Sequence, residues 1–363
     1  MKALILAGGF GTRLRPLSCT RPKTLFPIIN KPLLQWIFEK LAKSSVTEVI
    51  LAVNQHTALY IKQQRIPKYG LRVKYSHDPN RMPLGTGGPV KKAEKLIGHT
   101  EPFLVVNGDI LTELNYKELV ESHKKTNALA TIALCKVEDP SRYGVAQITE
   151  DNRITKFVEK PPKETAPSNL INAGVYVLSP SVFQYIQAGK AVSMEREVFP
   201  KLVEKGALYG HVTNDMWIDI GKPEEYLQTN KLLLDTVIGN RQKHNSTGKF
   251  QLKNPVALDK KVAIGEKSEI GPYSVIGKNA TIGKNVKINN SVIFPDAKIG
   301  DSSSITGAII GEGAFIGKNV KISKGCIIAD QAKVRDNISL PEEAAVCPAK
   351  EITENIFKTK IIC

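Results

Sequence analysis

Apolar runs of strand length alternate with helix-like segments along the first part of the chain. The apolar runs lie at residues 2–7, 48–53, 71–77 and 103–106. Helical spacing of apolar positions, or a helix-like pattern, occurs at residues 33–41, 56–65 and 91–96. This alternation predicts a mostly parallel α/β sheet with helices on both faces. Ligands bind such sheets outside the carboxyl ends of the strands.

From about residue 128 the pattern changes to consecutive strands. They are predicted at residues 128–137, 144–149, 154–158, 171–178 and 208–212. We interpret them as a mixed extension of the sheet that covers one side of the crevice. Helices are predicted at residues 181–187 and 195–205, and another begins at Pro223, where a proline and two acidic residues form a favourable first turn.

The last third of the chain repeats with a period of six residues. Its aliphatic positions, with two five-residue steps, are Leu258, Ile264, Ile270, Ile276, Ile282, Ile288, Ile293, Ile299, Ile305, Ile310, Ile316, Ile322, Ile328 and Val334, and glycine follows many of them. This period is typical of a parallel β-helix, here of about four coils. We therefore predict a first domain at 1–240, a linker at 241–254, a β-helix at 255–340 and a tail at 341–363 that is either helix or strand.

The first apolar run leads into a loop rich in glycine and cationic residues. Gly8, Gly9 and Gly11 are followed by Arg13, Arg15, Arg21 and Lys23. Such a strand and loop bring backbone N–H groups and positive charge to a polyanion such as a nucleoside triphosphate. Neither common phosphate-loop pattern fits, because no Gly-Lys-Ser/Thr follows and Leu14 stands where a dinucleotide loop has its third glycine.

Two aspartates follow or interrupt apolar segments. Asp109 ends the run at 103–106, and Asp219 lies between Ile218 and Ile220. A structural aspartate in a turn is the alternative for each, although a carboxylate with apolar neighbours needs a partner. Together at the edge of a phosphate site they suit Mg²⁺, which takes one or two carboxylates and substrate phosphates.

Two further positions suit a polar ligand. Glu159 and Lys160 stand at a strand end before Pro161, where lysine would hold a phosphate and glutamate would accept hydrogen bonds from hydroxyls. An exposed ion pair is the alternative. Asn172 interrupts an apolar strand beside Ala173 and Gly174, which suits either ligand binding or a bulge.

Charge and composition argue against a nucleic-acid-binding protein. The chain has 51 Lys and Arg against 35 Asp and Glu, a net charge of +16, without a block of like charges. Aromatic residues are 6% of the chain and do not alternate with basic ones, so nucleic-acid binding is not expected. A basic enzyme with anionic substrates accounts for the charge.

The cysteine, histidine and hydropathy patterns show none of the features of a disulfide-rich, zinc-binding or membrane protein. The five cysteines are scattered, without a C-x-x-C pattern, so we expect neither a disulfide framework nor a zinc site. The run at 2–7 is too short for a signal sequence and no stretch reaches membrane-spanning length, so a cytoplasmic protein is expected. The isolated histidines suggest no nucleophile or general base, which fits phosphoryl-type transfer.

The loop and the later motifs together resemble the sugar-1-phosphate nucleotidylyltransferases. After residues 8–16 and 22–23, the matching segments are 83–86, 107–109, 143–145, 157–161, 172–174 and 217–221, in the order of that family. Segments 83–89, 137–145 and 195–200 most resemble the mannose-1-phosphate guanylyltransferase group. The resemblance implies a Rossmann-like, glycosyltransferase-A-like nucleotidyltransferase domain followed by a left-handed β-helix.

The resemblance also implies a reaction and a role for each motif. A sugar 1-phosphate would attack the α-phosphate of an NTP, most simply GTP with mannose 1-phosphate, giving NDP-sugar and pyrophosphate. The implied roles are nucleotide binding by Gly8, Gly9, Gly11, Thr12, Pro83, Leu84, Gly85 and Thr86, catalysis by Arg13, Lys23, Asp109 and Asp219, Mg²⁺ binding by the two aspartates, and sugar-phosphate binding by Gly144, Glu159, Lys160 and Asn172.

Three alternatives stay open beside this interpretation. A glucose-1-phosphate thymidylyl- or uridylyltransferase shares much of the frame. A bifunctional acetyltransferase would use a histidine in the β-helix, but the last histidine is His244. A non-catalytic regulatory subunit tends to lose the cationic loop or the aspartates, which this chain keeps. We also expect a homo-oligomer assembled through the β-helix.

Overall fold

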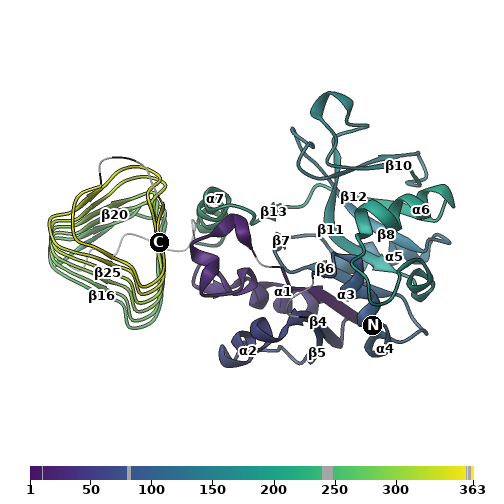
Figure 1. The fold of residues 1–363 in the computed structure, drawn as a ribbon, viewed down its shortest axis with the longest axis horizontal. Coiled ribbons are helices and arrows are strands. Elements are labelled where there is room, and N and C mark those ends of the chain that lie inside the picture. The colour runs from purple at the N-terminus through teal and green to yellow at the C-terminus, as the bar shows by residue number, and fades with distance from the viewer. Residues whose placement is uncertain (10, 80–82, 239–247, 357, 359–360) are drawn as a thin grey trace. The chain divides into compact units, whose positions relative to one another are not determined.

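The computed structural model describes residues 1–9, 11–79, 83–238, 248–356, 358 and 361–363 (Figure 1). These residues form two compact units. The first contains Met1–Gly9 and Leu33–Asp219, and the second contains Phe10–Pro32 and Ile220–Cys363. The first unit is therefore smaller than the predicted first domain at 1–240, because Phe10–Pro32 and the residues after Asp219 belong to the second unit.

A mixed sheet forms the centre of the first unit. Its strands run in the order β10-β9-β11-β6-β1-β4-β5, with β8 beside β11 and β12 beside β8. Their bounds are β1 Lys2–Leu6, β4 Glu48–Asn54, β5 Arg72–Asp78, β6 Phe103–Asn107, β8 Ala130–Lys136, β9 Gly144–Ile148, β10 Ile154–Glu159, β11 Leu170–Leu178 and β12 Leu208–Thr213. Strands β6, β1, β4 and β5 are parallel. Because β1, β4 and β6 are buried along most of their length, they read as continuous apolar runs, and the predicted mixed α/β sheet is confirmed.

Helices and short turns connect these strands. The α-helices are α1 Leu33–Ala42, α2 Gln55–Gln63, α3 Gly87–Lys92, α4 Glu94–Ile97, α5 Tyr116–Lys124 and α6 Phe199–Glu204. Helix α1 forms as predicted because its apolar residues fall on one buried face. The helix predicted at 181–187 is a 3-10 helix, Pro180–Tyr185, and the one at 195–205 begins as a π-helix, Met194–Val198, before α6. A further 3-10 helix spans Lys163–Thr165.

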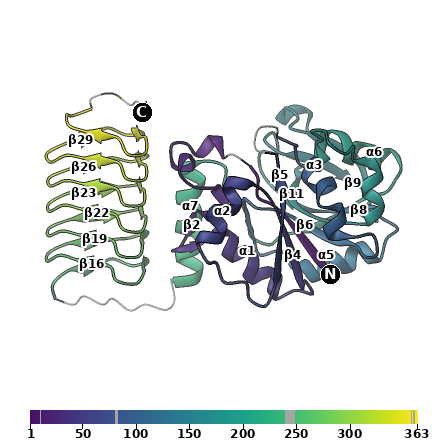
Figure 2. The same cartoon turned by 60° about the horizontal axis from the view of Figure 1, so that its bottom comes forward.

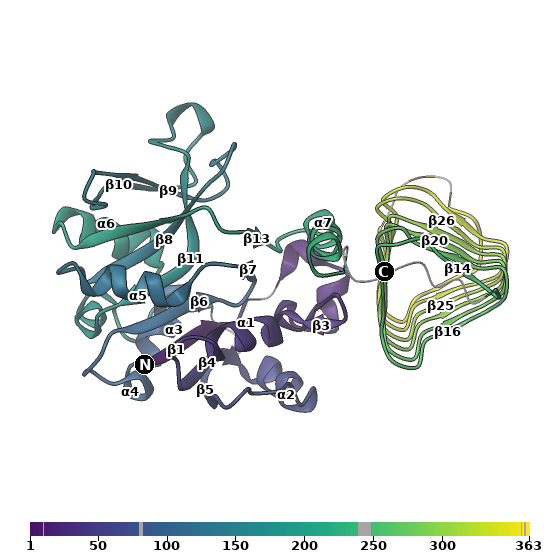
Figure 3. The same cartoon turned by 180° about the vertical axis from the view of Figure 1, so that it is seen from behind.

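Within the second unit, the segment after Gly9 folds as three 3-10 turns and a small hairpin. The turns are Thr12–Leu14, Leu17–Cys19 and Lys23–Leu25, and the hairpin pairs β2 Pro27–Ile28 with β3 Lys31–Pro32. Helix α7 Pro223–Leu233, which continues as a π-helix Leu234–Ile238, lies beside this segment (Figure 3).

A β-helix completes the second unit, and its coils stack in register (Figure 2). The first sheet contains β14 Gln251–Leu252, β17 Glu269–Ile270, β20 Lys287–Asn289, β23 Ser304–Thr306, β26 Lys321–Ile322 and β29 Ser339–Leu340. The second contains β15 Val256–Leu258, β18 Ser274–Ile276, β21 Val292–Ile293, β24 Ile309–Ile310, β27 Ile327–Ile328, β30 Ala345–Val346 and β32 Ile361–Ile362. The third contains β16 Ala263–Ile264, β19 Thr281–Ile282, β22 Lys298–Ile299, β25 Phe315–Ile316, β28 Lys333–Val334 and β31 Glu351–Ile352.

The repeat extends further than the sequence pattern predicts. Strands run from Gln251 to Ile362, past the expected limits of 255 and 340, and each sheet has at least six strands where about four coils are expected. The reason is that the six-residue period continues beyond Val334 through Leu340, Val346 and Ile352, without isoleucine and glycine at every step. Pairing of neighbouring coils stacks these aliphatic side chains into one buried core.

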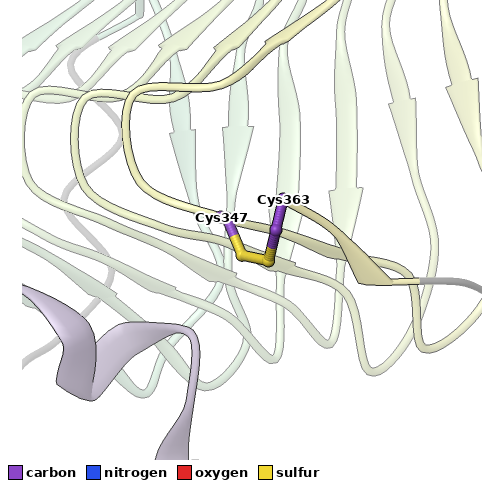
Figure 4. The surroundings of a disulfide bond; sticks show 2 residues. All are labelled: Cys347 and Cys363. Carbon is purple, nitrogen blue, oxygen red and sulfur yellow. A yellow bond between two sulfur atoms is a disulfide. The ribbon is translucent and has the colours of Figure 1, made fainter.

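A disulfide joins Cys347 to Cys363 at the end of the β-helix (Figure 4). From the sequence we expect no disulfide framework, and this single pair is not predicted. Strands β30 and β32 are parallel neighbours, so the residues that follow them meet, with their Cα atoms 4.8 Å apart. No helix in the described ranges is long and apolar enough to cross a membrane.

Candidate active site

Register brings Asp109 and Asp219 together in the first unit. Gly108 N donates to Leu6 O at 2.9 Å, which places the end of β6 beside the end of β1. Immediately after Asp109, strand β7 (Ile110–Thr112) pairs with β13 (Trp217–Asp219) (Figure 3). In this pairing Asp219 lies opposite Ile110. The two aspartates therefore occupy neighbouring positions at one strand pair.

Asp109 and Asp219 are the residues that the sequence analysis expects to bind Mg²⁺. Among the residues that the structure describes, no cluster of three or more His, Cys, Asp or Glu side chains could hold a metal ion. Mg²⁺ is usually bound by one or two carboxylates together with substrate phosphates, so a pair of aspartates is a sufficient protein donor set.

Of the two glycines that directly follow β1, Gly8 is closely packed against a neighbouring side chain and Gly9 is not. Ala7 N donates to Ala52 O at 2.9 Å, which continues the sheet up to Gly8. A Cβ at Gly8 would lie 3.1 Å from Asp78 Oδ2, whereas a Cβ at Gly9 would meet nothing within 4 Å. Asp78 is a residue that the sequence analysis missed: its Oδ1 is buried without a hydrogen-bond partner in the described residues, and burial raises its pKa.

The predicted base-binding segment at 83–86 contacts the residues that precede α6, at 192–195. Thr86 Oγ1 donates to Glu195 Oε2 at 2.6 Å and accepts from Met194 N at 2.9 Å. Gly85 has φ +69°, and a Cβ there would lie 2.4 Å from Val192 O. The hydroxyl of Thr86 thus positions Glu195, which the sequence analysis named only as part of segment 195–200 and without a role of its own.

Glu159 lies in a partly buried acidic environment. It pairs in register with Gly144, where a Cβ would lie 3.0 Å from Glu159 Oε2 and 2.5 Å from Phe157 Cζ. Burial and the nearby Glu195 raise the pKa of Glu159, although Lys160 opposes the shift. Lys160 Nζ lies 3.5 Å from Glu159 Oε1 on a side chain that is 58% exposed. The lysine head group is therefore accessible to a phosphate.

Asn172 lies at a bulge in β11, so the structural alternative for this motif is present. Its Oδ1 accepts from Gly174 N at 2.9 Å and its Nδ2 donates to Tyr176 OH at 3.0 Å. Gly174 has φ +69°, and a Cβ there would lie 2.3 Å from Ile110 Cδ1. The bulge thus packs directly against the strand that follows Asp109, and Trp217 Nε1 donates to Ala173 O at 2.8 Å.

The second unit contains the cations of the loop together with Gly11 and Thr12. Gly11 has φ +57° and its carbonyl accepts from Ser18 Oγ at 2.7 Å, which turns the loop back on itself. A Cβ at Gly221 would lie 3.2 Å from Arg13 Nη1 and 2.9 Å from Glu225 Oε2. The glycine at 221 therefore leaves room for the Arg13 guanidinium.

Lys23 is buried, with 8% of its surface exposed, in the turn Lys23–Leu25. Pro22 precedes it in an extended conformation, and Phe26 N donates to Lys23 O at 3.0 Å, which closes the turn. A buried ammonium group is stable only beside opposite charge or hydrogen-bond acceptors. This position is consistent with a lysine that takes part in an anion site.

Two family models match the chain, one for each part. The model described as "Nucleotidyl transferase" matches residues 2–236, and the "GMPPB C-terminal domain" matches residues 252–362. The β-helix region thus matches a family domain of its own.

Individual relatives agree with these models. A Xenopus laevis protein named mannose-1-phosphate guanyltransferase beta-A is 42% identical over 248 residues, which is 67% of each chain. A Debaryomyces hansenii mannose-1-phosphate guanyltransferase is 37% identical over 367 residues, covering 100% of both chains. Among solved structures, HddC from Yersinia pseudotuberculosis matches 64% of this chain and 99% of its own, with 31% identity and a TM-score of 0.54.

Proposed function

Because the chain belongs to the nucleotidyl transferase family, we propose that it converts GTP and mannose 1-phosphate into GDP-mannose and pyrophosphate. The observation that carries the proposal is the 37% identity over the full length of both chains to a mannose-1-phosphate guanyltransferase. That match includes the β-helix as well as the domain with the aspartates and the glycine loop. A complex of the structural neighbour HddC with GMP-PN supports a guanine nucleotide.

The proposed chemistry is an in-line transfer of the nucleotidyl group. An oxygen of the sugar 1-phosphate forms a bond to the α-phosphorus while the bond from that phosphorus to the oxygen bridging to the β-phosphate breaks, which releases pyrophosphate. The attacking phosphate oxygen is ionised at neutral pH, so positioning and charge neutralisation do most of the work. Neither a general base nor a covalent nucleophile is required.

Each group of residues has one task in this proposal. Backbone N–H groups of Gly8, Gly9 and Gly11 approach the nucleotide, and Arg13 and Lys23 neutralise the charge that develops on the departing pyrophosphate. Asp109 and Asp219 would hold Mg²⁺, which supplies positive charge to the phosphate oxygens when it is bound.

The sugar phosphate is assigned to the other motifs of the first unit. Lys160 contacts the phosphate through its exposed ammonium group, and the partly buried Glu159 accepts hydrogen bonds from sugar hydroxyls. Gly144 keeps the space beside Glu159 free of a side chain. Asn172 completes the subsite through the amide positions that its bonds to Gly174 and Tyr176 leave available. Self-association through the β-helix is a further part of the proposal.

One substrate matrix tests the proposed function. Pyrophosphate release is measured for four NTPs against the 1-phosphates of mannose, glucose and N-acetylglucosamine, with and without Mg²⁺. We expect GTP with mannose 1-phosphate to give the highest kcat/KM, and chelation of Mg²⁺ to abolish turnover. If GTP is not among the good substrates, the guanylyl assignment is wrong, and a preference for dTTP or UTP with glucose 1-phosphate would replace it.

A further inference from the structure

The loop that follows Gly9 is bonded to two carboxylates of the β-helix. Thr20 Oγ1 donates to Asp330 Oδ2 at 2.6 Å. Arg21 Nη2 donates to the same oxygen at 2.9 Å and to Glu312 Oε2 at 2.6 Å. All four residues belong to the second unit. We infer that Asp330 and Glu312 are positioning residues that hold this loop, and with it Lys23, in the geometry that binds the polyphosphate of the nucleotide.

This inference rests on the proposed role of Lys23 in phosphate binding, because it assigns to the β-helix a task in the same reaction. Arg21 and Lys23 are separated only by Pro22, whose fixed φ leaves little freedom between them. A displacement of Arg21 is therefore passed on to Lys23. Misplacement of a substrate-binding group by about 1 Å can cost roughly 100-fold in rate.

The contact has the properties of a built site and not of a surface ion pair. The side chains of Arg21 and Asp330 are only 14% and 9% exposed. The Arg21 guanidinium also lies over the ring of Phe294, 4.9 Å from its centre. Burial lowers the pKa of Arg21, but Asp330 and Glu312 more than offset this effect, and the pKa is raised overall. The planar fork of arginine suits two acceptors that a lysine could not serve equally.

The chain after Lys23 is fixed to the same unit by separate contacts. The ring of Phe26 packs edge-on against Tyr226 and Phe294, at centre distances of 5.8 and 6.3 Å. Tyr226 OH donates to Pro27 O, and Asn30 Nδ2 donates to Ile276 O at 3.0 Å. Lys23 is thus held from both sides, by Arg21 before it and by Phe26 after it.

Asp330 also makes a bond between neighbouring coils of the β-helix, as do Asp301 and Asp336. Asp301 Oδ1 and Asp336 Oδ1 each accept from the backbone N–H of a residue one coil earlier, Lys284 and Lys318, at 2.8 Å. Asp330 Oδ1 accepts from Glu312 N in the same way, at 2.7 Å. Its other oxygen, Oδ2, is the atom that Thr20 and Arg21 use. The two tasks can therefore be separated by substitution.

The central experiment compares Asp330→Asn with Asp336→Asn in the full-length enzyme. Asparagine keeps an oxygen for the coil-to-coil bond in both variants, but in Asp330→Asn it places an amide NH₂ opposite Arg21. We expect Asp330→Asn to raise the KM for GTP and the Kd for Mg²⁺-pyrophosphate about tenfold, while the KM for mannose 1-phosphate changes by less than about twofold. Asp336→Asn should change none of these.

Substitutions at Arg21 provide an independent test. Arg21→Gln should resemble Asp330→Asn, and Arg21→Lys should lie between it and the wild type because it keeps the charge but loses the fork. The double variant Arg21→Gln/Asp330→Asn should be no worse than the more severe single variant, because both remove the same contact. Effects that multiply would contradict a common mechanism. If the Arg21 variants do not fold, Asp330→Asn decides alone.

Three results separate failure of this inference from failure of the proposed function. An unchanged KM for GTP and Kd for pyrophosphate in Asp330→Asn, with or without a lower Tm, would overturn the inference and leave the function standing. If the wild type makes no GDP-mannose but binds pyrophosphate, the proposed function is wrong. The inference is then still tested by comparing the Kd for Mg²⁺-pyrophosphate of Asp330→Asn with that of the wild type. A wild type that binds neither GTP nor pyrophosphate would overturn both.

Discussion

At the residue scale, backbone contacts and local side-chain bonds hold several residues of the candidate site. Asp219 is placed by its register with Ile110, and Lys160 by its N–H, which donates to Tyr143 O at 2.9 Å. Thr86 holds Glu195 through its hydroxyl. Side chains of this kind can be changed without removing the contacts that fold the chain.

The two aspartates offer the most direct test at this scale. We expect Asp109→Ala and Asp219→Ala to lower Mg²⁺-dependent kcat by about 100-fold or more, because each removes charge from the proposed metal site. Pyrophosphate release measures the effect, and circular dichroism should show an unchanged fold. Asp139→Asn, at an exposed turn where the side chain accepts from Ser141 N, is the matched control. Near-normal activity in both alanine variants would contradict the metal assignment.

The raised pKa of Glu159 predicts a pH effect on sugar binding. Burial and Glu195 favour its protonated form, which cannot accept as many hydrogen bonds, so the KM for mannose 1-phosphate should rise as the pH falls through this raised pKa. Glu195→Gln removes the second cause and should move the rise in KM to lower pH. Titration of the substrate itself is common to both enzymes and cancels in the comparison.

The adjacent Glu197 provides the control for this prediction. Its Oε1 accepts from Ser193 N at 2.9 Å, and it is not among the charges that act on Glu159. Glu197→Gln should leave the pH profile unchanged. If Glu195→Gln and Glu197→Gln give the same profile as the wild type, Glu195 does not control the ionisation of Glu159. The raised pKa of Glu159 also affects stability. Because the folded protein holds this proton more tightly than the unfolded chain does, the wild type loses stability as the pH rises from 4.5 to the raised pKa.

At the element scale, irregular positions bring the strands of the site together. The bulge of β11 lets Gly174 approach β7, and the pairing of β7 with β13 places Asp219. Bulges commonly occur next to active sites, where they redirect side chains. The position of the site thus depends on one left-handed glycine.

Gly174→Ala tests this dependence. A Cβ would lie 2.3 Å from Ile110 Cδ1, and φ +69° is unfavourable for alanine, so we expect a loss of about 2–4 kcal/mol in the free energy of unfolding and a lower kcat. Urea unfolding and pyrophosphate release measure the two effects. Gly189→Ala is the control, because Gly189 has φ +75° but nothing within 4 Å, and it should lose only about 1 kcal/mol. Equal losses in the two variants would show that the contact with Ile110 is unimportant.

The disulfide gives a second prediction at this scale. It closes a loop across a sequence separation of 16 residues, so its removal by Cys363→Ser should cost up to about 3 kcal/mol in stability of the last coil. Thermal unfolding with and without dithiothreitol measures this. Cys19→Ser, at an exposed free cysteine, is the control. A wild type whose Tm does not respond to reductant would contradict a stabilising role.

At the scale of the whole molecule, local patterns predicted the elements and distant contacts decided their grouping. The parallel strands and the six-residue repeat are visible because their periods are local. The membership of Phe10–Pro32 in the second unit is not, since it depends on bonds such as that between Arg21 and Asp330, which lie 309 positions apart. The pairing of Cys347 with Cys363 is not visible either, because it depends on the stacking of β32 on β30.

The candidate site shows the same division. Asp109, Glu159 and Lys160 stand at strand ends, where a pattern of apolar runs points directly to them. Asp78 also ends a strand, β5, but its significance, like that of Glu195, comes from contacts with Gly8 and Thr86, which the fold places beside these residues. The roles proposed for all of these residues stay predictions until the substitutions are measured.

The end of the β-helix has a consequence for solubility and assembly. A solenoid that simply stopped would present unpaired N–H and C=O groups, a template on which a further chain could add strands and grow a fibre. Here Asn355 Oδ1 accepts from Ser339 N at 2.7 Å on β29, and β32 covers β30, where the disulfide fastens it. These contacts therefore occupy part of the hydrogen-bonding edge at this end, on β29 and β30, where a further chain could otherwise add strands.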